Sequence, residues 1–190
     1  MTKARDLANG GFGLVLMKPS SVVNGTDNGK GTVTIGSAVS SVSLNDVFNS
    51  TYKNYKIKYT TNAFSAAGNF NFRLRVSNSD NSSSNYKFHQ VDGQGASPWW
   101  DGFTATADTK WTFHRYTRPD GVNGEIEVYQ PYETSYTGAT ARSTTNNYSI
   151  SQGAEFSGTI TVTTSYTGFT LFPETGTMTG GTISVYGYNN

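Results

Sequence analysis

The sequence predicts an all-β protein, an antiparallel β-sandwich of jelly-roll type with a short N-terminal arm. The chain is rich in aromatic residues, with 12 Tyr, 11 Phe and 3 Trp, and aromatic residues and Thr favour strands. Its 21 Gly and many Asn favour turns. Apolar and polar residues alternate in many segments, the period of a strand with one buried face. Such strands must form two packed sheets or close on themselves, so a barrel is the second architecture.

The chain of 190 residues is expected to form one domain after an attachment segment. We place the arm at residues 1–20 and the sandwich at residues 21–190. A domain of this size can bury most of its apolar surface without metals or disulfides. The beginning of the chain resembles a signal peptide only weakly, because Asp6 precedes a short apolar run and no cleavage site follows.

The first elements are short. A strand is expected over residues 12–17, ended by Pro19, and further strands over residues 32–35 and 38–44. A short helix is then expected over residues 43–55. Ser43 and Asp46 have the spacing of a capping box, and Val47, Phe48 and Tyr52 would cover the buried face of that helix.

The clearest alternation comes next. Residues 55–59 place Tyr55, Ile57 and Tyr59 on one face, with Lys56 and Lys58 opposite. Residues 70–76 predict a second strand, whose buried side chains would be Phe70, Phe72, Leu74 and Val76, with Arg73 and Arg75 opposite. The same alternation recurs in shorter pairs: Tyr86/Phe88, Ile126/Val128, Ile160/Val162, Phe169/Leu171 and Ile183/Val185.

Charge and composition bear on partners. The formal net charge is +1, which gives no electrostatic reason to expect nucleic-acid binding. No apolar run is long enough to span a membrane, so membrane insertion is not expected. The chain has no Cys and therefore no disulfides or thiolate metal ligands. We expect no cofactor.

The sequence does not predict an enzyme. His89 and His114 lack the spacing of a metal site and are expected at the surface or hydrogen-bonded. Glu125 and Glu127 would lie roughly 7 Å apart on one strand face, a spacing compatible with glycoside hydrolysis. We favour cross-strand ion pairs for these two carboxylates. Asp27 is expected in a turn rather than in a calcium site.

Four aromatic residues are candidate contacts. Trp99 and Trp100 are adjacent, so on a strand they would face opposite ways, and one would remain exposed. They could cover the end of the sandwich, anchor a subunit contact or stack on a sugar. Tyr186 and Tyr188 would share one face opposite buried Ile183 and Val185, where a partner subunit could cover them. Gly180 and Gly181 are expected to form a tight turn before this strand.

Two segments resemble structural proteins of tailed bacteriophages, notably marine cyanophages. In the pattern V-F-S-S-T-Y-x-N-Y, residues 47–55 match with Asn49 in place of the first Ser. In the terminal pattern G-T-x-T-G-G-T-I-x-V-Y-G-Y, residues 176–188 match. The opening stretch TKARDLANG is similar to the join that precedes such domains in longer fibres.

The resemblance implies a virion protein on the exterior surface, made in the host cytoplasm. Such proteins are often tail-fibre or receptor-binding components and sometimes capsid decorations. It implies a homotrimer, attached to other virion proteins through the N-terminal arm and able to meet a host surface glycan. A carbohydrate-binding module is an alternative function with the same fold.

Overall fold

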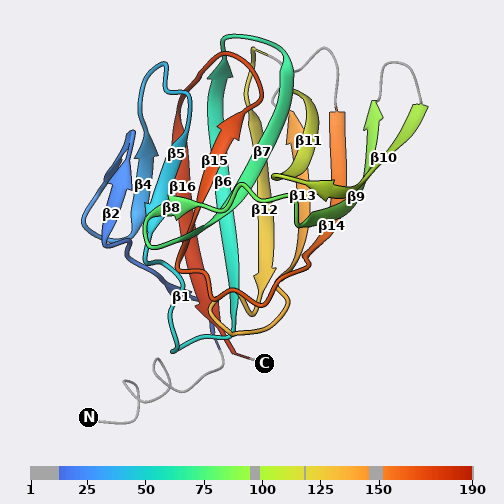
Figure 1. The fold of residues 1–190 in the computed structure, drawn as a ribbon. Helices are drawn as coiled ribbons and strands as arrows, with labels where there is room; N and C mark the ends of the chain where they lie inside the picture. The colour runs from blue at the N-terminus through green and yellow to red at the C-terminus, as the bar shows by residue number, and fades with distance from the viewer. Residues whose placement is uncertain (1–12, 95–98, 118, 146–151, 190) are drawn as a thin grey trace.

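The computed structural model describes residues 13–94, 99–117, 119–145 and 152–189. Within these ranges the chain forms sixteen strands and no helix. The strands build two antiparallel sheets that face each other (Figure 1). The predicted all-β, antiparallel sandwich is therefore confirmed, whereas the jelly-roll topology stays a prediction.

The larger sheet has ten described strands in the order β10-β9-β14-β13-β12-β6-β16-β4-β3, with β1 also paired to β16. Its strands, in chain order, are β1 (Val15–Leu16), β3 (Gly25–Asp27), β4 (Thr32–Ile35), β6 (Asn54–Phe64), β9 (Tyr86–Gln94), β10 (Trp99–Asp108), β12 (Val122–Tyr129), β13 (Gly138–Thr145), β14 (Gln152–Ile160) and β16 (Met178–Tyr188). The N-terminal strands β3 and β4 thus lie at one edge of this sheet, next to the C-terminal strand β16.

The smaller sheet has six described strands in the order β11-β7-β15-β5-β2, with β8 paired to β7. Its strands are β2 (Ser21–Val23), β5 (Val42–Asn45), β7 (Gly68–Val76), β8 (Ser79–Asp80), β11 (Trp111–Thr117) and β15 (Gly168–Pro173). The expected strand over residues 32–35 coincides with β4.

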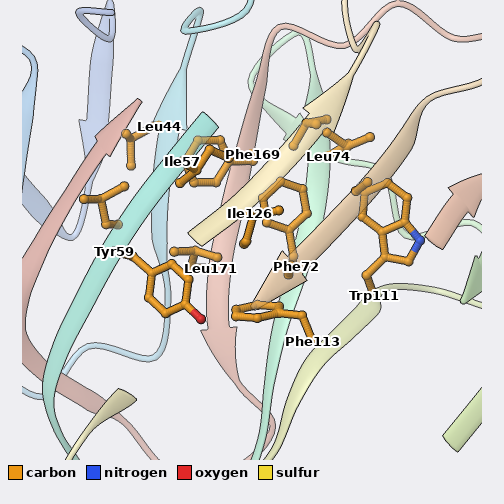
Figure 2. Packing of buried hydrophobic residues seen from close by; sticks show 14 of the residues in the cluster. Leu44, Ile57, Tyr59, Phe72, Leu74, Trp111, Phe113, Ile126, Phe169 and Leu171 are labelled. Carbon is orange, nitrogen blue, oxygen red and sulfur yellow. The ribbon is translucent and has the colours of Figure 1, made fainter. Parts of the chain in front are cut away.

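The core between the sheets is largely aromatic (Figure 2). Phe72 stacks on Phe169 with ring centroids 5.2 Å apart, and Trp111 meets Tyr86 edge to face at 5.4 Å. Phe70, Phe72 and Leu74 are buried as predicted, but Val76 is 36% exposed. Val76 ends β7 beside a hairpin whose Ser77 and Asn78 have positive φ, so it lies at the edge of the packed layer.

The short helix predicted over residues 43–55 is wrong. Its first residues belong to β5, and Asp46 follows with a φ of 54°. Phe48 is nevertheless buried, and its ring centroid lies 4.7 Å from that of Tyr55. The backbone N–H of Asn49 donates to the Tyr55 hydroxyl at 2.7 Å, and this hydroxyl donates to the Asn49 carbonyl at 2.8 Å. Tertiary packing of the apolar residues therefore replaces helical hydrogen bonds.

The first described residues already belong to the sandwich. In β1, Val15 pairs with Gly187 and Leu16 with Tyr186, and the Met17 N–H donates to the Val185 carbonyl at 2.8 Å. The strand expected over residues 12–17 is thus observed in shortened form. Residues 1–12 of the predicted arm lie outside the described residues.

Candidate functional site

The two segments that carry the phage resemblance lie side by side. The turn at residues 47–53 leads into β6, and β6 pairs with β16 along its length. The Asn189 side chain ties the end of β16 to this turn, since its Oδ1 accepts from the Lys53 N–H at 2.9 Å and its Nδ2 donates to the Thr51 carbonyl at 3.2 Å. Residues far apart in the chain thus form one structural unit at one end of the sheet.

Glycines of the terminal segment are required by close contacts. A Cβ on Gly187 would lie 2.5 Å from a ring carbon of Tyr52, so the tyrosine of the first segment packs on the glycine of the second. Gly180 and Gly181 have φ of 62° and 100°. They lie inside β16 and not in the tight turn that we expected. The glycines of these segments therefore have a structural role in the fold.

A polar cluster covers the outer face of this unit. Lys56 Nζ lies 2.9 Å from Glu127 Oε1 and 3.5 Å from Glu125 Oε2, so the predicted cross-strand ion pairs are present. The Tyr129 hydroxyl donates to Glu127 Oε2 at 2.8 Å. Burial would raise the pKa of the Glu127 carboxyl, but hydrogen bonds from Lys56 and Tyr129 outweigh it and the pKa is lowered. Glu127 is thus held ionised by its neighbours.

Tyr186 and Tyr188 share the outer face, as predicted, while Ile183 and Val185 are buried. Both tyrosines are half-buried. Tyr188 hydrogen-bonds Glu127, and burial together with that negative charge raises the pKa of Tyr188 to about 12. Tyr188 therefore belongs to the polar cluster, and Tyr186 pairs with Leu16 at the edge where β1 joins the sheet.

A row of alternating charge crosses the same face beside this cluster. Cα pairing aligns four residues on adjacent strands, which we call the charged row: Lys58, Glu125, Arg142 and Glu155. Arg142 Nε lies 3.3 Å from Glu155 Oε1, and their side chains are 77% and 70% exposed. Three depressions of about 410, 370 and 420 Å³ meet at Arg142.

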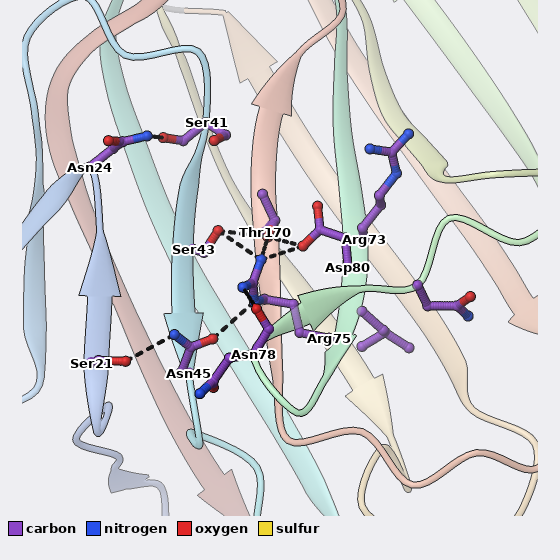
Figure 3. Close-up of polar contacts among 12 residues, drawn as sticks. Ser21, Asn24, Ser41, Ser43, Asn45, Arg73, Arg75, Asn78, Asp80 and Thr170 are labelled. Carbon is purple, nitrogen blue, oxygen red and sulfur yellow. Dashed lines mark hydrogen bonds and ion pairs between the residues drawn. The ribbon is translucent and has the colours of Figure 1, made fainter.

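On the outer face of the smaller sheet, polar side chains form a hydrogen-bonded network around Arg75 (Figure 3). The Arg75 guanidinium donates to Asn45 Oδ1 at 2.9 Å, Ser43 Oγ at 3.1 Å and Thr170 Oγ1 at 2.9 Å. It also contacts the Asp80 carboxylate and the Asn78 carbonyl. We expected Arg75 to point outward on a plain surface, but the β7–β8 hairpin folds over it and leaves it 9% exposed.

The two histidines have different surroundings. His89 is exposed on β9. His114 is buried, and its Nδ1 lies 2.8 Å from Ser143 Oγ. Both positions agree with the expectation of a surface or hydrogen-bonded histidine. Burial lowers the pKa of His114 to about 4.

The free energy of unfolding should therefore decrease as the pH is lowered from 6.5 to 4. In that range the histidine of the unfolded chain binds a proton, whereas buried His114 of the folded chain does not. We expect a loss of about 3 kcal/mol from this residue. In the His114→Asn variant, which can keep a hydrogen bond to Ser143, this part of the pH dependence should vanish. Urea unfolding at pH 7, 5.5 and 4 measures it, with His89→Asn as the control. Parallel profiles for wild type and His114→Asn would contradict the prediction.

Trp99 and Trp100 begin β10, which lies at one edge of the larger sheet. Their backbones pair with Gln94 and Gly93, and Gly93 pairs in turn with Gly153 of β14. Their side chains lie outside the described part of the chain, so the choice among end cover, subunit contact and sugar platform stays open.

The remaining expectations concern ions and membranes. Asp27 Oδ1 accepts from the Gly29 and Gly31 N–H groups at 3.1 and 3.2 Å, as a turn residue does. In the described ranges, no group of three or more His, Asp or Glu could hold a metal ion. The same ranges contain no helix that could cross a membrane.

Arg142 and Glu155 were not predicted as site residues. The buried positions of β13 carry small residues, Ala139, Ala141 and Ser143, so apolar alternation is faint there. A pattern of small residues alternating with polar ones was the signal that could have located this strand. No family model matches the chain, and a search of curated proteins finds no match.

Proposed function

We propose that the chain is a non-enzymatic structural protein of a phage virion, a tail-fibre or receptor-binding component on the exterior surface. One observation supports this most. The two segments that resemble phage structural proteins pack on each other through Tyr52 and Gly187, so they form one coherent unit of the fold.

Its mechanism would be assembly followed by recognition of the host surface. The arm would dock on other virion proteins, and β1 would connect it to β16 of the larger sheet. The rigid aromatic core would hold the recognition face in shape. A capsid decoration would use the same features at another place on the particle.

We place the contact between subunits of a homotrimer at the β1 edge. Leu14 and Leu16 are 53% and 37% exposed there, beside half-buried Tyr186. Apolar and aromatic side chains of this kind anchor subunit interfaces. No comparable pair of exposed leucines occurs elsewhere in the described residues.

Light scattering should give three times the chain mass of 20.5 kDa. The Leu16→Asp variant should lower that mass, since it places a charge in the contact. Val23→Asp is the matched control, because Val23 is 45% exposed on the smaller sheet. A wild-type monomer at micromolar concentration would overturn the trimer.

Immunogold labelling of intact virions tests the location. Label on tail fibres supports a receptor-binding component, and label over the capsid supports a decoration protein. Virions without label would overturn the proposed function. A carbohydrate-binding module outside a virion would then be the better explanation, because the larger sheet still presents an open polar face.

A further inference from the structure

We propose that the outer face of the larger sheet binds an uncharged polysaccharide chain, laid across β6, β12, β13, β14 and β9 over the charged row. The proposal deepens the proposed function, on which it rests for bringing the protein to a host surface. It concerns a different part of the molecule from the β1 edge.

The face has the length of an extended ligand. The charged row continues from Glu155 to Val91 on β9 by Cα pairing. Five adjacent strands at about 4.8 Å spacing give a row of about 19 Å. The three depressions run along it, since Glu125 lines the first and second, Glu155 the first and third, and Arg142 all three.

Next to the row, on β14, β9 and β10, the surface is low because these positions carry glycines. A Cβ on Gly153 would meet only the Ser143 carbonyl, at 3.7 Å, and one on Gly102 would meet nothing within 4 Å. Gly93 lies between Gly153 and Trp100 in the pairing. A flat ring could therefore approach the backbone here, with charged side chains standing on one side of it.

The charged groups have unused hydrogen-bonding capacity. Glu127 is satisfied by Lys56, Tyr129 and Tyr188, whereas Glu125 Oε2 lies 3.5 Å from Lys56 Nζ. Arg142 and Glu155 are largely exposed and meet through one nitrogen and one oxygen. A sugar hydroxyl both donates and accepts, so it can bridge a carboxylate and a neighbouring guanidinium by charge-assisted hydrogen bonds.

The charge pattern argues for an uncharged ligand. Lys58 and Arg142 balance Glu125 and Glu155, and a polyanion would meet both carboxylates. The row could also pair with the same row of a second copy in the reverse direction, because opposite charges would then face each other. Interface centres are depleted in charged residues, however, and this face has four at its centre.

Affinity electrophoresis in gels containing mannan, dextran or galactan tests the proposal, with heparin as the charged probe. Wild type should be retarded by at least one neutral polymer. Arg142→Ala and Glu125→Gln should each weaken that binding by about tenfold, the loss of one charge-assisted hydrogen bond. Lys18→Ala and Glu133→Gln, which remove exposed charges outside the row, should bind as wild type does.

Three results would overturn the proposal: no retardation by any neutral polymer, retardation by heparin alone, or a change of molecular mass without a change of binding in Arg142→Ala. The last would identify the face as a contact between copies. If the wild-type protein binds no neutral polysaccharide but immunogold label is found on virions, this inference is rejected and the proposed function stands.

Discussion

Replacing Gly181 with alanine is expected to lower the free energy of unfolding by about 3–5 kcal/mol. Gly181 has a φ of 100°, which a residue with a side chain rarely adopts. A Cβ there would also lie 2.1 Å from the Thr60 carbonyl oxygen on the neighbouring strand. Since β6 and β16 both lie in the interior of the larger sheet, neither backbone can move without breaking the pairing.

Gly29→Ala separates the two contributions. Gly29 has a φ of 80°, but an added Cβ would meet nothing within 4 Å. That variant should therefore lose only the conformational part, about 1–2 kcal/mol. Urea unfolding of both variants at pH 7 provides the comparison. Equal losses would mean that the close approach of the two strands contributes nothing.

The strands with strong alternation could be predicted from the sequence alone. In β6 the buried positions carry Tyr55, Ile57 and Tyr59, and in β7 they carry Phe70, Phe72 and Leu74. Large apolar residues at every second position identify the face that packs against the other sheet. Val76 shows the limit of the pattern, because burial also depends on whether the opposite sheet reaches that far.

Other elements could not be predicted because long-range packing determines them. Val47, Phe48 and Tyr52 fit the spacing of a helical face, yet hydrogen bonds between the Asn49 backbone and the Tyr55 hydroxyl fix this stretch in a non-helical turn. In β13 the buried residues are small, and Ala141 pairs with the large Phe156 on β14. Propensity and periodicity do not contain this information.

The candidate site was predictable in part. Alternation placed Tyr186 and Tyr188 on one face and indicated cross-strand ion pairs for Glu125 and Glu127, but it did not identify their partners. The charged row needs the register of β12, β13 and β14, which single-strand patterns do not give. Arg142 and Glu155 become neighbours only through that register.

Arg75→Ala is expected to destabilise the fold by about 3–4 kcal/mol. The buried guanidinium links β7 to Asn45 and Ser43 on β5 and to Thr170 on β15. It also fastens the β7–β8 hairpin through Asp80. Removing it would leave the Asp80 carboxylate with the hydrogen bond from the Thr170 hydroxyl. Most of the loss should come from these unsatisfied groups.

Arg75→Lys and Arg73→Ala distinguish the network from charge alone. A lysine keeps the positive charge but cannot place donors on five partners in the plane of a guanidinium, so Arg75→Lys should recover less than half of the loss. Arg73 donates to the Thr109 carbonyl at 3.0 Å and lies over the Phe172 ring, outside this network. Its replacement by alanine should reduce stability by about 1 kcal/mol. If Arg73→Ala and Arg75→Ala lost equal stability in thermal and urea unfolding, the proposed role of the Arg75 network in holding the smaller sheet together would be refuted.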